Sequence, residues 1–225
     1  MKTIILCGGL GTRISEETIK KPKPMVKVGK IPILEHILNI YIKHGYDEFI
    51  LATGYKNRII ENYFKSKKIN AKIKCINTGK KTLTGGRIKR LKKYINKNEN
   101  FMVTYGDGLS NVNLKKLYNF HLKNKKLVTV TAVRPPARFG HLKIKKNLVS
   151  YFKEKSHTDE GWINGGFFVI NSKFLDYIKN DESILEKEPL ERACKKKNLV
   201  AYKHHGFWQC VDTKRDLDRL KKILK

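Results

Sequence analysis

Short apolar runs alternate with helix-like segments along the first 133 residues of the chain. The run at residues 2–7 is apolar after a single lysine, as expected of a buried strand. Residues 32–45 place apolar side chains at positions 33, 37, 40 and 41, on one face of a helix. The patterns recur, with strands expected at 48–54, 71–79, 101–108 and 127–133, and helices at 56–65, 85–95 and 114–124. This alternation predicts an α/β fold, Rossmann-like, in which helices flank a mainly parallel sheet and ligands bind at the carboxyl ends of strands.

The pattern changes after residue 133. Three shorter strand candidates follow at residues 141–144, 148–155 and 163–170, with little helix between them. We expect them to form a small antiparallel excursion that supplies the second wall of a cleft. The chain then returns to helix at 174–179 and 189–197, to a strand at 199–203 and to a terminal helix at 214–224. Since no repeat or long linker interrupts them, residues 1–225 are expected to form a single domain.

Composition adds a strong positive charge. The formal net charge is +29, and most of the 49 basic residues are lysines spread over the whole length. Because no arginine-rich tail or RNA-binding signature is present, we expect no specific nucleic-acid partner, only weak, salt-sensitive binding to polyanions. No apolar run reaches the about 20 residues that cross a bilayer, so we expect a cytoplasmic protein without a membrane partner. The four cysteines form no CxxC pair and are expected to be free thiols.

The segment after the first strand, LCGGLGTRISEETIKKPKPM at residues 6–25, is rich in glycine and in positive charge. Gly8, Gly9 and Gly11 can present backbone N–H groups to an anion, and phosphate is the obvious candidate. Arg13 can clamp phosphate oxygens with its planar guanidinium. Lys23 lies between two prolines, which stiffen its backbone. The alternatives are an ordinary strand-to-helix turn with solvated charges, and a lysine at the surface.

Two aspartates follow apolar segments in positions that suit a divalent cation. Asp107 lies in YGDG at the end of a strand candidate, and Asp212 lies in QCVDT just before the terminal helix. Magnesium usually takes one or two protein carboxylates and completes its coordination with substrate phosphates and water. We therefore predict that Asp107 and Asp212 form a magnesium pair. The alternatives are a tight Asp-Gly turn at Asp107 and a helix cap formed by Asp212 or Thr213.

Two weaker patterns suggest a second substrate. The sequence TLTGGRIKR at residues 82–90 opens a basic helix, and its backbone N–H groups suit base edges or phosphates. EKS at 154–156 and INGG at 163–166 bring a carboxylate, a lysine and an amide into the second part of the chain. This set suits a sugar phosphate, with the lysine for the charge and the other two for hydroxyls. We therefore expect a nucleotide-binding half at about 1–133 and a sugar-phosphate-binding half at about 134–225.

Taken in order, these motifs resemble those of the sugar-1-phosphate nucleotidylyltransferases. The usual pattern of that family is GGxGTR followed by KPxP, and this chain has CGGLGTR at 7–13 and KPKPM at 21–25. The resemblance covers nearly the full length, through TGYK at 53–56, TGGRIKR at 84–90, YGDG at 105–108, PPARFG at 135–140, INGGFFVI at 163–170, EPLE at 188–191 and GFWQCVDT at 206–213. TGGR and FWQxxDT make the order most similar to the glucose-1-phosphate cytidylyltransferases.

The resemblance implies a role for individual residues. Arg13 would bind the nucleotide phosphates, Lys23 would stabilise the α-phosphate during attack, and Arg87 would help to read the cytosine. The implied nucleotide-binding set is Leu6, Gly8, Gly9, Gly11, Thr12, Arg13, Lys23, Thr84, Gly85, Arg87, Tyr105 and Gly106. The implied sugar-phosphate set is Gly140, Glu154, Lys155, Asn164 and Gly165, and the implied Mg²⁺ ligands are Asp107 and Asp212.

The function implied is an Mg²⁺-dependent transfer of a cytidylyl group from CTP to a sugar 1-phosphate, giving a CDP-sugar and pyrophosphate. One alternative is a nucleotidylyltransferase that uses another nucleoside triphosphate or another acceptor, such as a heptose or polyol phosphate, since EKS stands where the family has EKP. An alternative of a different class is a basic nucleic-acid-binding module without catalysis. The segment between TGYK and TGGR is short for the family, so the sequence leaves open whether the protein forms a homo-oligomer.

Overall fold

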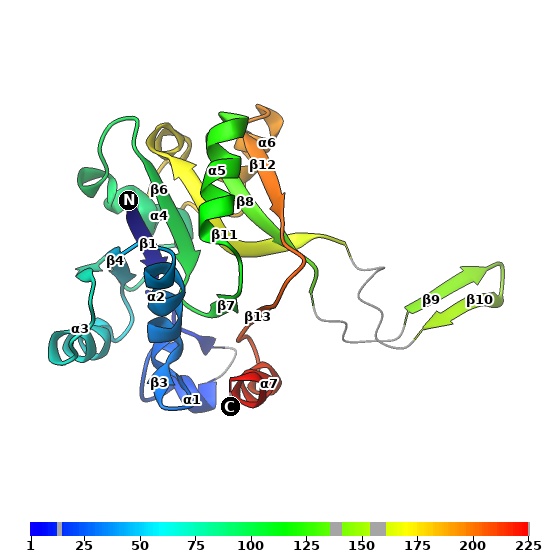
Figure 1. Ribbon diagram of the computed structural model, residues 1–225, viewed down its shortest axis with the longest axis horizontal. Coiled ribbons are helices and arrows are strands. Elements are labelled where there is room, and N and C mark those ends of the chain that lie inside the picture. The colour runs from blue at the N-terminus through cyan, green and yellow to red at the C-terminus, as the bar shows by residue number, and fades with distance from the viewer. Residues whose placement is uncertain (13–14, 136–140, 154–160, 225) are drawn as a thin grey trace.

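The computed structural model describes residues 1–12, 15–135, 141–153 and 161–224 of the chain. Its centre is a seven-stranded sheet with the strand order β12–β8–β11–β6–β1–β4–β5 (Figure 1). In chain order, these strands are β1 (Lys2–Leu6), β4 (Glu48–Thr53), β5 (Lys72–Asn77), β6 (Asn100–Tyr105), β8 (Val128–Val133), β11 (Ile163–Asn171) and β12 (Leu199–Lys203).

Neighbouring strands run parallel except at β11, which is antiparallel to both β6 and β8. The mainly parallel α/β fold predicted from the sequence is thus confirmed. The position of β11 is a correction, because the strand expected at 163–170 belongs to the main sheet and not to a separate excursion. Its four consecutive apolar residues at 167–170 are all buried, so this strand needs a helical layer on each face. Pairing with β6 also joins the two predicted halves of the chain in one sheet.

Helices cover both faces of the sheet. The helices on one face are α2 (Ile33–Lys43), α3 (Asn57–Ser66), α5 (Leu114–Asn124) and α7 (Lys214–Ile223). The other face is covered by α4 (Thr84–Arg90), α6 (Glu188–Lys195) and the 3-10 helix η4 (Ser172–Tyr177). Strand β1 contributes Ile5 to the first core and Ile4 and Leu6 to the second. This alternation explains why its sequence is apolar throughout.

Two helix predictions differ from the structure. The helix expected at 85–95 ends at Arg90, and a separate 3-10 turn, η3 (Lys92–Tyr94), follows it. The helix expected at 174–179 is the 3-10 helix η4, whose N-cap Asn171 accepts a hydrogen bond from the backbone of Lys173. Both segments are short, and tertiary packing decides between helix types over so few residues.

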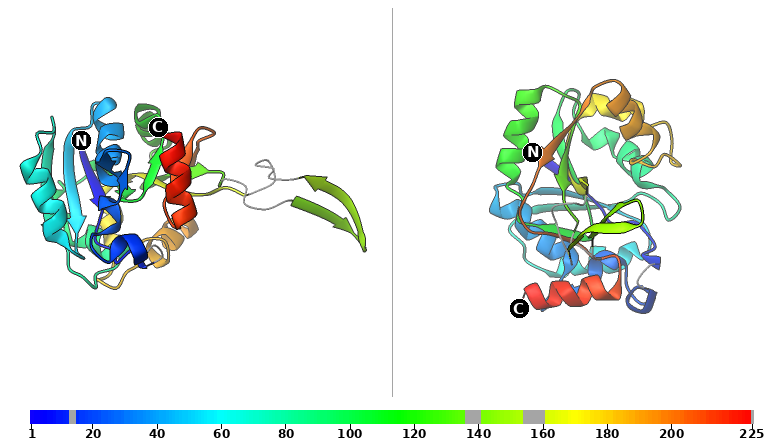
Figure 2. Two further views of the ribbon diagram at one scale, coloured as in Figure 1. Left: turned by 90° about the horizontal axis from the view of Figure 1, so that it is seen from below. Right: turned by 90° about the vertical axis from the view of Figure 1, so that its right-hand side faces the viewer.

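The shorter elements lie outside the seven-stranded sheet. They are α1 (Ser15–Thr18), the 3-10 helix η2 (Lys23–Met25), and the strand pairs β2 (Lys27–Val28) with β3 (Ile31–Pro32), β7 (Gly108–Ser110) with β13 (Trp208–Cys210), and β9 (His141–Lys145) with β10 (Leu148–Lys153). The β9–β10 hairpin is the antiparallel excursion expected from the sequence, and it stands apart from the seven-stranded sheet (Figure 2). Within the described ranges, no helix is long and apolar enough to span a membrane. All four cysteines are free thiols.

Candidate active site

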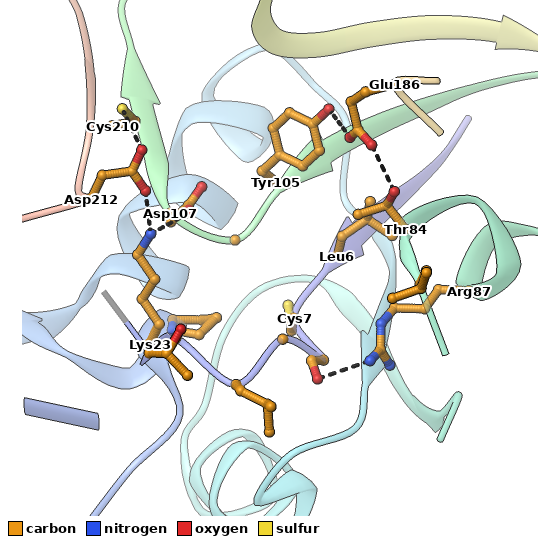
Figure 3. A pocket seen from close by; sticks show the side chains of 18 of the residues that line it. Leu6, Cys7, Lys23, Thr84, Arg87, Tyr105, Asp107, Glu186, Cys210 and Asp212 are labelled. Carbon is orange, nitrogen blue, oxygen red and sulfur yellow. Dashed lines mark hydrogen bonds and ion pairs between the residues drawn. The ribbon is translucent and has the colours of Figure 1, made fainter. Parts of the chain in front are cut away.

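A cavity of about 1030 Å³ opens at the carboxyl ends of β1 and β6 (Figure 3). The predicted residues that line it are Leu6, Gly8, Gly9, Gly11, Thr12, Lys23, Thr84, Arg87, Tyr105, Gly106, Asp107, Asn164 and Asp212. Gly85 and Gly165 are not among its lining residues. The remaining candidates, Arg13, Gly140, Glu154 and Lys155, lie outside the residues that the structure describes. The parallel strands bring the strand-end motifs to one edge of the sheet, as the sequence predicts.

The opening loop packs closely against the guanidinium of Arg87. The carbonyl oxygen of Gly8 accepts hydrogen bonds from Arg87 Nη2 at 2.9 Å and from the backbone N–H of Tyr55 at 3.2 Å. A Cβ atom at Gly8 would lie 2.0 Å from Arg87 Nη1, so any other residue would require the guanidinium to move from its hydrogen bonds. Gly9 has open space around it, and Gly11 has a φ of +68°, which favours glycine. A ligand can therefore come close to the backbone N–H groups of this loop.

Lys23 lies between the two predicted metal ligands. Its Nζ atom is 2.6 Å from Asp107 Oδ2 and 2.8 Å from Asp212 Oδ1. Lys23 as a whole is only 8% exposed, and the preceding Pro22 has the extended backbone that starts η2. Burial opposes the charged form, but the two carboxylates outweigh it and raise the pKa of Lys23. The ammonium is therefore charged at neutral pH and neutralises part of the negative charge of both aspartates.

Backbone pairing fixes the separation of these two aspartates. Strand β13 pairs with β7, and the N–H of Val211 donates to the carbonyl oxygen of Asp107 at 3.0 Å. The N-cap of α7 is Thr213, which forms a capping box with Asp216, so Asp212 is not the cap. Burial and the nearby Asp212 charge raise the pKa of Cys210 to about 12, which keeps its thiol protonated beside Asp212 Oδ2.

The two aspartates fit a divalent cation that arrives with phosphates. Both carboxylates already converge on one cationic atom, Lys23 Nζ, and carboxylate oxygens are the ligands that magnesium prefers. Among the described residues, no group of three or more His, Cys, Asp or Glu side chains could hold a metal ion. Two carboxylates are the number that magnesium commonly takes when substrate phosphates supply the other ligands.

Arg87 connects three segments of the cavity wall. Its Nη1 atom donates to the carbonyl oxygens of Thr53 at 3.1 Å and Gly79 at 2.8 Å, and to Thr78 Oγ1 at 2.7 Å. Its Nη2 atom donates to the carbonyl oxygen of Gly8 at 2.9 Å. Arg87 as a whole is 4% exposed, and burial lowers its pKa. In this structure the guanidinium thus orders the ends of β1, β4 and β5. The cytosine contact implied for Arg87 stays a prediction.

The glycines of TGGR serve close packing in this structure. The N–H groups of Gly85 and Gly86 both donate to the carbonyl oxygen of Ser183, at 2.9 and 3.1 Å. A Cβ atom at Gly86 would lie 2.4 Å from the carbonyl oxygen of Asp181. These N–H groups are therefore engaged with the loop that precedes α6, which differs from the base or phosphate contact that the sequence suggests. Gly165 does not line the cavity, and its carbonyl oxygen accepts a hydrogen bond from Nε1 of the cavity-lining Trp208 at 2.8 Å.

Three charged residues that line the cavity, Lys80, Lys81 and Glu186, were not among the residues predicted from the sequence, and Glu186 has the most defined contacts. Its carboxylate accepts hydrogen bonds from Thr84 Oγ1 at 2.7 Å and from the hydroxyl of Tyr105 (Figure 3). The Tyr105 hydroxyl accepts in turn from Asn164 Nδ2 at 3.2 Å. Burial, followed by the charge of Glu186, raises the pKa of Tyr105, so the phenol stays protonated and donates. The only sequence signal near Glu186 was the EPLE motif two residues later.

Comparison with known proteins identifies the family. The model of the nucleotidyl transferase family matches residues 2–223, which is nearly the whole chain. The chain belongs to the nucleotidyl transferase family. The resemblance read from the motifs is thereby confirmed, and the protein is an enzyme of this type. Nucleotidyl transferases of this family generally use a divalent metal ion, which agrees with the carboxylate pair.

Individual nucleotidyl transferases align over almost the full length of this one. The glucose-1-phosphate cytidylyltransferase of Salmonella typhimurium is 42% identical over 96% of this chain and 93% of its own. The probable glucose-1-phosphate cytidylyltransferase of Bacillus subtilis is 40% identical over 99% and 96%. A crystal structure of HddC from Yersinia pseudotuberculosis complexed with GMP-PN is 26% identical, with a TM-score of 0.79 over 100% of this chain and 99% of that one.

Proposed function

We propose that this nucleotidyl transferase moves a cytidylyl group from CTP to a sugar 1-phosphate, such as glucose 1-phosphate, giving a CDP-sugar and pyrophosphate. The observation that carries the proposal is the contact of Lys23 with Asp107 and Asp212 beside the glycine-rich loop in one cavity. The choice of cytosine and of the acceptor rests on the relatives named as glucose-1-phosphate cytidylyltransferases. The proposal includes a cytoplasmic location, where CTP is available, and no specific nucleic-acid partner.

The reaction needs charge neutralisation more than proton transfer. A phosphate oxygen of the sugar 1-phosphate attacks the α-phosphorus of CTP, the new P–O bond forms, and the bond to the β-phosphate oxygen breaks in line. The attacking phosphate is already ionised, so no general base is required. Two anions must be brought together, and fixed positive charge and N–H donors lower that barrier. Lys23 and the glycine-rich loop provide these groups, and Arg13 is predicted to add a third.

We assign the metal to Mg²⁺, held by Asp107 and Asp212. When bound, the ion would neutralise charge on the triphosphate. Lys23, which contacts both carboxylates here, would then offer its ammonium to the α-phosphate. We also propose that residues from about 1 to 133 form the main part of the nucleotide site and residues from about 134 to 225 the main part of the sugar-phosphate site, where Asn164 lines the cavity.

A second candidate function is guanylyl transfer to another sugar phosphate. The HddC structure complexed with GMP-PN favours it, because its fold covers this chain completely at 26% identity. A heptose 1-phosphate would then be a candidate acceptor, since relatives named as heptose 1-phosphate guanylyltransferases are 34–35% identical. The sequence identity to the cytidylyltransferase of Salmonella typhimurium is higher, at 42%, so CTP remains the nucleotide of the main proposal.

The test is pyrophosphate release with Mg²⁺, in which CTP, UTP, GTP, ATP and dTTP are each paired with glucose 1-phosphate, a heptose 1-phosphate and a polyol phosphate. We expect release with CTP and a sugar 1-phosphate, and formation of the matching CDP-sugar. Release only with GTP would replace the first function by the second. Absence of release with every pair, from protein that is folded by circular dichroism, would contradict both.

A further inference from the structure

Glu186 is a carboxylate without a cationic partner in a cavity proposed to receive polyanions. It lines the cavity, and its two oxygens take two neutral donors, the hydroxyls of Thr84 and Tyr105. Within the described ranges, no lysine or arginine forms an ion pair with it. This is unusual in a chain with a net charge of +29.

A carboxylate in this position works against the binding of phosphate. Like charges repel, and a partly buried site weakens that repulsion less than water does. Phosphate oxygens only accept hydrogen bonds at neutral pH, as does an ionised carboxylate, so the two cannot bond. The groups that Glu186 can bind are therefore neutral N–H and O–H donors.

The hydrogen bonds around Glu186 all run toward it. Asn164 Nδ2 donates to the Tyr105 hydroxyl, which donates to Glu186. On the other side, the backbone N–H of Leu185 donates to Thr84 Oγ1 at 2.9 Å, and Thr84 donates to Glu186. Each hydroxyl proton is thus committed to the carboxylate. An ionised carboxylate has about four acceptor positions, so about two remain after these hydrogen bonds.

Two of the three side chains around Glu186, Thr84 and Tyr105, belong to the predicted nucleotide-binding set, and the third, Asn164, belongs to the predicted sugar-phosphate set. Thr84 is the first residue of α4, and the guanidinium of Arg87, in the same helix, donates a hydrogen bond to the opening loop. Tyr105 is the register partner of Leu6, the last residue of β1 before that loop. The triphosphate end, with Lys23, is a separate cluster in the close-up view (Figure 3). Because the two side chains that donate directly to Glu186 both belong to the nucleotide-binding set, the nucleoside is the part of the substrate expected to reach it.

We propose that Glu186 is a specificity-determining residue that accepts a hydrogen bond from a neutral donor of the bound nucleoside. The donor is either the exocyclic amine of the base or a ribose hydroxyl, both of which a carboxylate binds well. The inference rests on the proposed function, because it takes the cavity as a nucleotide site. Thr84 and Tyr105 hold the carboxylate in place, and Glu186 makes the contact.

The experiment measures equilibrium binding by calorimetry, with Mg²⁺ and without any acceptor sugar. Wild type and Glu186→Gln are titrated with CTP, with UTP, which lacks the exocyclic amine, and with 2′-deoxy-CTP, which lacks one hydroxyl. Glutamine keeps the shape but presents only one acceptor oxygen. The matched control is Glu182→Gln, an exposed residue of the same loop that does not line this cavity. Melting temperatures establish that the variants are folded.

We expect Glu186→Gln to weaken CTP binding about 10- to 100-fold, the usual loss for a hydrogen bond to a charged group. For the nucleotide that lacks the contacted donor, Glu186→Gln should weaken binding by less than about threefold, because that nucleotide cannot form the hydrogen bond with either the wild type or the variant. That nucleotide is UTP if the donor is the amine and 2′-deoxy-CTP if it is the hydroxyl. Glu182→Gln should bind all three like the wild type.

Equal losses for all three nucleotides would overturn the inference, since Glu186 would then only brace Thr84 and Tyr105. Unchanged binding of all three would overturn it as well. If wild type bound none of the nucleotides, the proposed function itself would fail, which separates the two claims. Should Glu186→Gln not fold, Glu186→Asp keeps the charge, withdraws the carboxylate by one methylene group, and must show the same dependence on the nucleotide.

Discussion

At one end of the cavity two carboxylates share one ammonium, and at the other end one carboxylate accepts from two hydroxyls. Asp107 and Asp212 contact Lys23 at 2.6 and 2.8 Å, whereas Glu186 accepts from Thr84 and Tyr105. The first arrangement attracts a further cation and the phosphates that accompany it. The second leaves an acceptor for neutral donors. The same chemical group, a carboxylate, therefore serves two different purposes, and the hydrogen-bond partners of each carboxylate indicate which purpose it serves.

The largest expected effect follows the loss of charge at the first end. Asp107→Asn keeps the size of the side chain but removes one of the two charges that hold the metal. We expect kcat to fall at least about 100- to 1000-fold, as when one stabilising group is removed from a preorganised site. Pyrophosphate release at saturating Mg²⁺ and substrates measures it. Asp181→Asn is the control, because that aspartate pairs with Arg90 at the surface. Near-normal kcat in Asp107→Asn would remove it from the metal site.

The next effect is expected at Lys23. Lys23→Met keeps an unbranched apolar stem, which is one atom shorter than the lysine side chain, and removes the ammonium. If the ammonium stabilises charge on the α-phosphate only during attack, kcat should fall about 100-fold while the binding of CTP changes little. Single-turnover rates and the CTP dissociation constant are measured together. A large loss of CTP affinity with normal kcat would instead make Lys23 a ground-state contact.

The glycine-rich loop connects the two ends, and it offers a matched pair of variants. Gly8→Ala places a Cβ atom 2.0 Å from Arg87 Nη1, whereas Gly9→Ala meets nothing within 4 Å. We expect Gly8→Ala to lower the free energy of unfolding by about 1–3 kcal/mol through overpacking. Gly9→Ala should change it by less than about 0.5 kcal/mol. Urea denaturation tests both, and equal effects would mean that Arg87 adjusts freely to the loop.

The smallest effect is expected beyond Asp212, where Thr213 caps α7. Thr213→Ala removes the acceptor for the backbone N–H of Asp216 and breaks the capping box. Loss of such a cap costs about 1 kcal/mol of stability. Thermal denaturation measures it, with Thr213→Ser as the conservative control that should restore most of the loss. An unchanged melting temperature in Thr213→Ala would show that packing alone holds α7.

Local signals were enough to predict much of the cavity. Gly8 and Asp107 follow apolar strands, and parallel strands carry such residues to one edge of a sheet. Lys23 was singled out by the two prolines that flank it. Asp212 could also be placed, because QCVDT precedes a clear terminal helix. Each of these residues is marked by its immediate neighbours in the sequence, and the structure brings all four to the same cavity. The roles assigned to them stay predictions.

Other features depend on packing between distant segments and left no local signal. Glu186 reaches the cavity because its loop packs on Gly85 and Gly86 of α4, about 100 residues earlier in the chain. The insertion of β11 between β6 and β8 could not be read from periodicity, since buried parallel and antiparallel strands have similar apolar runs. The partners of Arg87 likewise lie on three separate segments.

The most direct test of the account is a titration with Mn²⁺ followed by electron paramagnetic resonance, in which Mn²⁺ replaces Mg²⁺. With wild type alone, we expect weak binding, because Lys23 occupies the position between the carboxylates. Adding CTP should create a tight site, since its phosphates supply further ligands, and Asp107→Asn should abolish the increase. Tight binding without nucleotide, or an increase that survives Asp107→Asn, would contradict the assignment of this end of the cavity to metal and phosphate.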